Sequence, residues 1–310
     1  MVLIDNCGRP LLNLRVAITQ KCNLNCTYCH REGEETINTH CEMTVNEIVH
    51  LVRIAVDLGL SKVKLTGGEP LVRKDIIDIV KNIAEIKGLK ELSMTSNGIL
   101  LAPLAEELYN NGLNRVNISL PTLHAETFKK LTGGKLRYVL ESVEAAVKAK
   151  LDPVKLNMTI LKGINDQDVN EMIEFAGKTG AILQIIELEP LNMSDEYYLE
   201  YHKSLDDYEL LLKRKALKIN YRRQMQNRAV YTLPNATVEV VHPIENTDFC
   251  NHCTRLRITS EGKLKPCLMR EDNLIDILTP MRSGASDKKL IELFKLANKK
   301  REPYYKGKRL

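Results

Sequence analysis

Short apolar runs alternate with stretches of helical periodicity over the first 190 residues of this sequence. Six of the runs have the length and composition of strands: residues 12–19, 62–66, 91–96, 115–120, 153–160 and 182–187. Helical patterns lie between them, and one of these begins with a capping box at Thr44 and Glu47. Strands that alternate with helices predict a parallel sheet with helices packed outside it.

Six strand–helix units are fewer than the eight that close a TIM barrel, so residues 1–190 predict an α/β fold with a partial (βα)6 barrel. The pattern changes after Pro190. A polar stretch, residues 192–201, is predicted to be a linker, and a helix is expected over 205–213. Hairpins are expected where residues 229–233 precede 237–241 and where 256–259 precede 263–265. Residues 191–310 are therefore predicted to form a smaller α+β module.

Three closely spaced cysteines follow the first predicted strand. Cys22, Cys26 and Cys29 have the spacing C-x3-C-x2-C, and no fourth cysteine lies nearby. A 4Fe–4S cluster is normally held by four thiolates, so three ligands leave one iron open to a small molecule. An open metal position is typical of a site that carries out chemistry, by analogy with zinc sites.

A second set of three cysteines lies near the other end of the chain. Cys250, Cys253 and Cys267 have the spacing C-x2-C-x13-C, which again lacks a fourth ligand. Zinc remains an alternative for both sets, with His30 or His252 as the missing ligand. A disulfide framework is not expected, because 8 cysteines in 310 residues are far fewer than disulfide-rich domains contain.

The first set, with Tyr28 directly before its third cysteine, resembles that of the radical S-adenosylmethionine (SAM) enzymes. Both sets together resemble the GTP 3′,8-cyclases, which begin molybdenum-cofactor biosynthesis, and the resemblance extends from about Arg15 to Leu268. It implies a radical SAM barrel over residues 1–190 and a domain over residues 191–310 that completes the barrel and carries a second cluster. The implied cofactors are two 4Fe–4S clusters and SAM.

The resemblance also implies an activity. A 5′-deoxyadenosyl radical removes hydrogen from C3′ of GTP, and the sugar radical closes on C8 of guanine. The product is (8S)-3′,8-cyclo-7,8-dihydroguanosine 5′-triphosphate. The implied partners are an electron donor and the downstream cyclic pyranopterin monophosphate synthase, and a homodimer is left open.

The expected SAM site lies at the strand ends, where ligands bind in α/β barrels. The segment Thr66-Gly67-Gly68-Glu69-Pro70 directly follows a predicted strand, and its glycines allow the backbone to approach a ligand closely. By resemblance, Gly68 holds the amine of SAM, Ser119 holds its carboxylate and the backbone of Tyr28 contacts adenine. Glu189 stands near the adenine, where the family commonly has methionine.

The expected GTP site depends on basic residues. The two-residue period of a strand places Arg255 and Arg257 on one face and Leu256 on the other. Two guanidinium groups suit a phosphate chain, although a solvated basic edge strand remains the alternative. By resemblance, these two arginines contact GTP together with four further residues: Arg15, Lys64, Thr95 and Lys155.

Several positions depart from the family pattern. Lys64 replaces a common arginine, Gln184 a basic residue and Pro121 an aspartate. The last five residues, 306–310, lack the Gly-Gly end that bacterial members insert into the site. We expect this basic tail to be a solvated end, and the competing hypothesis is that it folds over the open barrel.

Composition narrows the class of protein. The 45 Lys and Arg against 40 Asp and Glu give a net charge of +5, which suits one polyanionic small molecule. No apolar run reaches the ~18 residues of a membrane span and no signal pattern begins the chain, so a cytoplasmic protein without membrane contact is expected.

Two alternative functions remain open. One is a radical SAM enzyme with an auxiliary cluster that acts on a peptide or another nucleotide. The other is a zinc-stabilised nucleic-acid-binding protein. We expect no nucleic-acid partner, because 4 Phe and no Trp provide few aromatic side chains on which bases stack.

Overall fold

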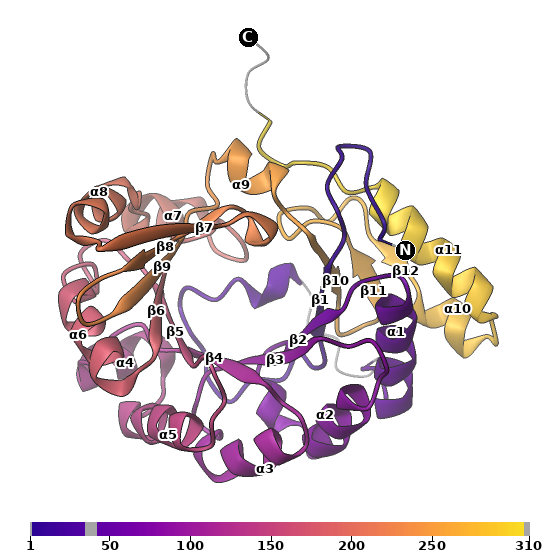
Figure 1. Cartoon of the computed structure of the whole chain (residues 1–310), viewed down its shortest axis with the longest axis horizontal. Coiled ribbons are helices and arrows are strands. Elements are labelled where there is room, and N and C mark those ends of the chain that lie inside the picture. The colour runs from indigo at the N-terminus through magenta and orange to yellow at the C-terminus, as the bar shows by residue number, and fades with distance from the viewer. Residues whose placement is uncertain (1, 35–41, 307–310) are drawn as a thin grey trace.

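The computed structural model describes residues 2–34 and 42–306 of the chain. Within these residues, 12 strands form a single sheet in the order β12-β11-β10-β1-β2-β3-β4-β5-β6-β9-β8-β7. Figure 1 shows that the sheet curls into an open barrel with most of the helices outside it. The predicted tail beyond Lys306 lies outside the described residues, so the two hypotheses about it remain predictions.

The six predicted strands are present and run parallel to one another, as the alternation of strands and helices predicted. They are β1 (Asn13–Ala17), β2 (Lys62–Thr66), β3 (Glu91–Ser96), β4 (Arg115–Ser119), β5 (Lys155–Thr159) and β6 (Ile182–Ile186). The helices that cover them are α1 (Val45–Asp57), α2 (Ile76–Ala84), α3 (Ala105–Asn110), α4 (Ala125–Thr132), α5 (Leu136–Lys148) and α6 (Val169–Thr179). The capping box of α1 is confirmed, since Thr44 and Glu47 bond each other's backbone N–H groups.

The part of the chain after residue 190 extends both edges of this sheet. On one side, β9 (Thr237–Val241) pairs parallel with β6, and β8 (Arg228–Thr232) and β7 (Lys218–Arg222) follow antiparallel. On the other side, β10 (Arg255–Ile258) pairs parallel with β1, followed by β11 (Lys263–Lys265) and β12 (Ile275–Asp276). Both expected hairpins, β8–β9 and β10–β11, are confirmed.

The predicted linker 192–201 is wrong in part, because it contains α7 (Asp195–Tyr201). Ser194 caps this helix by accepting a bond from the N–H of Tyr197 at 3.2 Å, and the rings of Tyr197 and Tyr201 pack with centroids 4.6 Å apart. The polar composition concealed this aromatic i, i+4 pair. The other helices are α8 (Asp206–Lys215), α9 (Thr247–Asn251), α10 (Leu278–Arg282) and α11 (Asp287–Lys299).

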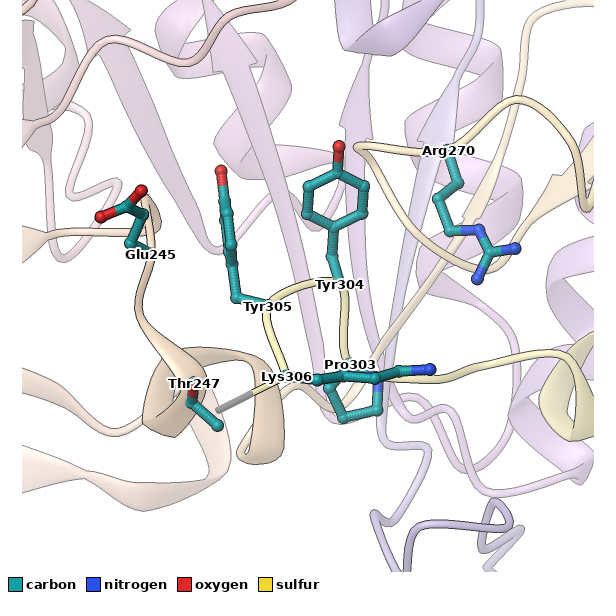
Figure 2. A pocket seen from close by; sticks show the side chains of 7 residues that line it. All are labelled: Glu245, Thr247, Arg270, Pro303, Tyr304, Tyr305 and Lys306. Atoms are coloured by element: carbon teal, nitrogen blue, oxygen red, sulfur yellow. The ribbon is translucent and has the colours of Figure 1, made fainter. Parts of the chain in front are cut away.

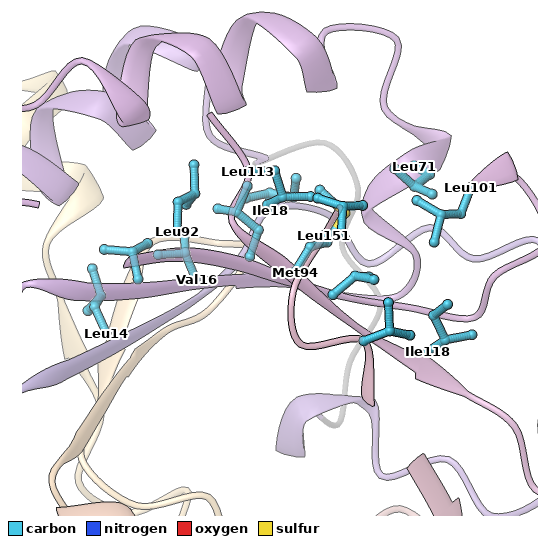
Figure 3. Close-up of a cluster of buried hydrophobic side chains, with 14 of the residues drawn as sticks. Leu14, Val16, Ile18, Leu71, Leu92, Met94, Leu101, Leu113, Ile118 and Leu151 are labelled. Carbon is cyan, nitrogen blue, oxygen red and sulfur yellow. The ribbon is translucent and has the colours of Figure 1, made fainter. Parts of the chain in front are cut away.

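The main apolar core lies between the sheet and the outer helices. Leu14 and Val16 of β1 and Met94 of β3 are buried there, and Figure 3 shows them in one cluster with side chains from neighbouring elements. Because side chains alternate along a strand, residues such as Arg15 point to the opposite, inner face. None of the helices in the described part of the chain is long and apolar enough to cross a membrane.

Gly177 provides a test of how α6 packs against the turn between β8 and β9. A Cβ atom at this position would lie 2.2 Å from the carbonyl oxygen of Asn235, in the turn between β8 and β9. Ala is normally the better helix former, but here we expect Gly177→Ala to lower the free energy of unfolding by about 1–3 kcal/mol through overpacking. Denaturant unfolding measures the change. Lys178→Ala on the exposed side of α6 is the control, and an equal or higher stability of Gly177→Ala would contradict this packing.

Candidate active site

Polar side chains cover the inner face of the barrel. The register places Arg15 beside Lys64 and Arg257, and Gln184 beside Asn157 and Glu239. A cavity on this side contains about 1800 Å³ of space that protein atoms do not fill, its open mouth included. Fourteen of the 16 predicted site residues line it: Arg15, Cys22, Cys26, Tyr28, Cys29, Gly68, Thr95, Ser119, Glu189, Cys250, Cys253, Arg255, Arg257 and Cys267.

The first cysteine set lies on a loop that follows β1 and contacts the end of α4. The N–H groups of Asn25 and Thr27 donate to the carbonyls of Thr132 and Leu131 at 3.1 and 2.9 Å. The loop also supplies N–H donors to two of its own sulfurs, at 3.4 Å each: Leu24 to Cys22 and Arg31 to Cys29. Such donors stabilise thiolates, which are the form that binds metal.

The three sulfurs lie near enough to influence one another. Burial raises the pKa of the Cys26 thiol to about 12, and the neighbouring Cys29 and Cys22 add to the rise. The pKa values of all three thiols are raised, so a cation is needed to hold them as thiolates. Three such thiols that line one cavity fit an iron–sulfur cluster.

The zinc alternative requires His30 or His252 to provide the fourth ligand of a cysteine set. Nδ1 of His30 accepts a bond from the N–H of Glu32 at 3.0 Å, and Nδ1 of His252 lies 3.1 Å from the carboxylate of Asp248. Across residues 2–34 and 42–306, no group of three or more His, Cys, Asp or Glu side chains is placed to hold one metal ion. A zinc site brings its four ligands to a single ion, whereas the thiolates of a 4Fe–4S cluster bind different irons.

The second cysteine set lies in a positive environment. Cys250 is on α9, and the N–H of Cys253 donates to its carbonyl at 3.2 Å. Burial by itself would raise the pKa of the Cys253 thiol, but Arg301, Arg255 and Arg257 lower it below its usual value. These cations favour anionic sulfur ligands and also an anionic substrate.

The glycine-rich segment after β2 is locked against the cysteine loop. The N–H of Gly68 donates to the carbonyl of Thr19 at 2.8 Å, and a Cβ at Gly68 would lie 2.4 Å from the carbonyl oxygen of Lys21. The buried carboxylate of Glu69 accepts bonds from the N–H of Asn97 at 2.6 Å and the hydroxyl of Ser96 at 2.9 Å. Burial raises the pKa of Glu69 to about 7 in spite of these donors. Together the bonds join the ends of β2 and β3 to the loop.

Glu32 is a central residue that the motifs did not reveal. Its carboxylate accepts bonds from Arg15 at 3.1 Å and from the hydroxyl of Thr66 at 2.9 Å, and lies 3.6 Å from Nε of Arg257. Burial opposes ionisation, but Arg15, His30 and Arg257 together lower the pKa of Glu32 to about 2. Glu32 therefore joins the cysteine loop to β1, β2 and β10.

The two predicted lysines do not line this cavity, which differs from the expected GTP site. Nζ of Lys64 donates to Oδ1 of Asn117 at 2.6 Å, and Lys64 lines a separate small cavity with Arg115. Lys155 forms an ion pair with the buried carboxylate of Glu239. The inner face of the barrel offered carboxylate and amide partners that a strand pattern by itself cannot reveal.

Glu187 is a second cavity residue that the prediction missed. It directly follows β6, so the rule that ligands bind at strand ends would have found it. Its carboxylate lies 3.0 Å from Nε2 of His202 and accepts a bond from the N–H of Ile244 at 3.1 Å. Burial raises the pKa of Glu187 to about 7.

The segment of residues 302–306 lies at the edge of the cavity. Tyr304 and Tyr305 line both the main cavity and a neighbouring groove, and Figure 2 shows them side by side between Glu245 and Arg270. Their rings meet edge to face with centroids 5.0 Å apart. Arg270 holds the segment through a 2.6 Å bond to Glu302.

Comparisons with known proteins agree with this geometry. Residues 16–176 match the Radical SAM superfamily, and residues 181–307 match the family described as Molybdenum Cofactor Synthesis C. Among similar solved structures are Streptococcus suis SuiB bound to S-adenosylmethionine and anSMEcpe with bound AdoMet. SuiB aligns with a TM-score of 0.65 and 17% sequence identity, over 95% of this chain and 67% of SuiB. The anSMEcpe structure aligns with a TM-score of 0.62 and 18% identity, over 94% of this chain and 84% of anSMEcpe. At these identities the structures show a shared fold, which is that of radical SAM enzymes.

Proteins with similar sequences identify the family more narrowly. A protein of Thermococcus kodakarensis named probable GTP 3′,8-cyclase is 50% identical over 98% of this chain and 100% of its own length. A protein of Pyrococcus abyssi with the same name is 48% identical over 98% of this chain and 100% of its own length. The chain therefore belongs to the GTP 3′,8-cyclase family of radical SAM enzymes. Its cofactors are SAM and two 4Fe–4S clusters, as the resemblance implied.

Gly68 tests the contact between the glycine-rich segment and the cysteine loop. Because the added Cβ would meet backbone oxygens, we expect Gly68→Ala to displace the loop and to weaken SAM binding at least tenfold, with less iron bound at the first cysteine set. Equilibrium binding of SAM and iron analysis measure both effects. Lys74→Ala, at an exposed position in the segment that follows β2, is the control. Normal SAM affinity in Gly68→Ala would show that the close approach is not required.

Proposed function

We propose that this cavity binds SAM at one end and GTP at the other, and that each ligand has its own set of binding residues. As a member of its family, the chain is an enzyme that cyclises GTP to (8S)-3′,8-cyclo-7,8-dihydroguanosine 5′-triphosphate, the first step of molybdenum-cofactor biosynthesis. The observation that carries the proposal is that both cysteine sets face one cavity whose wall between them carries buried arginines.

The relative positions of the two cysteine sets and the arginines between them follow from one pair of strands. β1 and β10 run parallel, with Asn13 beside Arg255 and Arg15 beside Arg257. Cys253 lies two residues before β10 begins, and Cys22 lies five residues after β1 ends. The two cysteine sets therefore belong to opposite ends of this pair, and Arg15, Arg255 and Arg257 lie between them. A substrate bound along the pair would have a cluster at each end.

The first end would bind SAM. Cys22, Cys26 and Cys29 would hold the cluster that SAM completes, and together they supply, when bound, the radical chemistry that removes hydrogen from C3′ of GTP. Gly68, at the end of β2, offers its backbone carbonyl to the SAM amine, and Ser119 offers its hydroxyl to the SAM carboxylate. The backbone of Tyr28 and the side chain of Glu189 would flank the adenine.

The second end would bind GTP. Cys250, Cys253 and Cys267 would hold the second cluster near the guanine, while Arg15, Arg255 and Arg257 hold the triphosphate and Thr95 orients the nucleoside. Arginine suits this role because its guanidinium stays charged and donates in a fork that matches phosphate oxygens. We propose that residues 1–190 act as the radical SAM domain and 191–310 as the auxiliary-cluster domain.

The reaction needs partners beyond GTP. Cleavage of SAM would consume one electron, and the cyclised guanine radical would take up a second electron and a proton to become the product. An external donor of two electrons per turnover is therefore required. The product is the substrate for cyclic pyranopterin monophosphate synthase in our proposal, and the reaction takes place in the cytoplasm, where thiols remain reduced.

The direct test is anaerobic incubation of the reconstituted protein with GTP, SAM and a reductant, followed by analysis of the products. We expect about eight irons per chain, roughly four for each cysteine set, and formation of cyclised GTP together with 5′-deoxyadenosine. Replacing Cys22, Cys26 and Cys29 with Ala should abolish SAM cleavage. Replacing Cys250, Cys253 and Cys267 should leave some SAM cleavage without cyclisation. Normal cyclisation by this second variant would refute the role of the second cluster.

The two arginines of β10 test the GTP end separately. Arg255→Ala or Arg257→Ala should each weaken GTP binding by about 1.5–3 kcal/mol, because each removes a charge-assisted contact. SAM affinity should stay the same, since its contacts lie at the other end of the cavity. Lys263→Ala on β11 is the matched control, because this lysine is a neighbouring cation that pairs with Glu261 and does not line the cavity. Equal losses of GTP and SAM affinity would indicate misfolding.

A further inference from the structure

Arg228 is a buried cation in the cavity wall that the predicted GTP site does not include. It is the first residue of β8 and is only 8% exposed. Its Nη2 donates to Oε1 of Gln226 at 2.6 Å, and its guanidinium lies 5.7 Å from the ring centre of Phe249, the residue before Cys250. These contacts orient the side chain beside the second cysteine set, and all three residues line the cavity.

Part of this guanidinium has no partner. Nη1 lies 3.4 Å from Oε1 of Glu239, whereas Nε is buried and makes no hydrogen bond. A buried donor without an acceptor costs about 1–3 kcal/mol, so such a group in a cavity wall is typical of a site that a ligand completes. Nε of Arg257, which lines the same cavity, is also buried without a hydrogen bond.

Positive charge exceeds negative charge in this part of the cavity. Arg255 and Arg257 are 8% and 7% exposed, and they line the same cavity as Arg228 and Arg15. Across the described residues no carboxylate forms an ion pair with Arg255, and Glu32 serves both Arg15 and Arg257. An anionic ligand with several charges would compensate this excess.

Glu239 forms ion pairs both with Lys155, which was predicted to bind GTP, and with Arg228. This buried carboxylate forms ion pairs with Lys155, Arg222 and Arg228, so three cations share one negative charge. Of the three, only Arg228 lines the cavity. Glu239 therefore holds Lys155 outside the cavity lining and orients Arg228 in the cavity wall. Because three cations surround one carboxylate, net positive charge remains at the wall.

We propose that Arg228 binds the triphosphate of GTP, together with Arg255 and next to the second cysteine set, and that it strengthens the preference for a triphosphate over a monophosphate. The proposal rests on the proposed function and adds a residue from the β7–β8 hairpin to the site. Arg228 acts as a binding residue through its guanidinium charge, and Glu239 and Gln226 position it.

The test compares equilibrium binding of GTP and GMP to anaerobically reconstituted protein. We expect Arg228→Gln to weaken GTP binding about tenfold or more while changing GMP binding less than about threefold, because one charge-assisted contact is lost at the phosphates. SAM affinity and iron content should equal those of the wild type. Arg222→Gln is the matched control, since Arg222 pairs with the same Glu239 at 3.0 Å but does not line the cavity.

Each outcome decides the proposal. A wild-type ratio of GTP to GMP affinity in Arg228→Gln would overturn it, and so would an equal loss in Arg222→Gln, which would assign the effect to Glu239. If Arg228→Gln does not assemble, Arg228→Lys replaces it, with an expected three- to tenfold lower ratio, and an unchanged ratio overturns the proposal. If the wild type does not bind GTP, the proposed function is refuted as well. If the wild type binds GTP and the variant keeps the wild-type ratio, only the role of Arg228 is refuted.

Discussion

The parallel pairing of β10 with β1 is the constraint on which the rest of the site depends. It joins residues 242 positions apart in the chain, and it brings a strand from the C-terminal part next to the first strand of the barrel. Because the strands are parallel and in register, alternation directs Arg15 and Arg257 to the same inner face. Without this pair the two cysteine sets would have no common cavity.

The inner face of the barrel contains several buried charged side chains. A buried ion costs several kcal/mol unless it is paired and hydrogen-bonded, and here two carboxylates supply most of the compensation. Glu32 neutralises the β1–β10 side, and Glu239 neutralises the opposite side near β5 and β8. The remaining positive charge lies around Arg255 and Arg228, between these two carboxylates. The electrostatic balance therefore leaves one region of the cavity that an anion completes.

Rigidity at the other end of the cavity has a different origin. Main-chain bonds join the glycine-rich segment after β2 to the cysteine loop, and the side chains of Glu69 and Ser96 extend this contact to β3. A backbone approach this close is possible because Gly68 has no Cβ. Cluster ligands and strand ends are thus held in a fixed arrangement, which a loop would not achieve by its own contacts.

Local patterns were sufficient to predict the six parallel strands, the capping box of α1, both hairpins and the two cysteine sets. Each of these depends on spacing along the chain, which the sequence contains directly. The sequence by itself did not show α7, because its tyrosines at i and i+4 stand in a polar stretch. Nor did it show that Lys64 and Lys155 are paired inside the barrel, or that Glu32, Glu187 and Arg228 reach the cavity. Only the tertiary structure decided these, because the partner of a buried charge comes from whichever strand or loop packs opposite it.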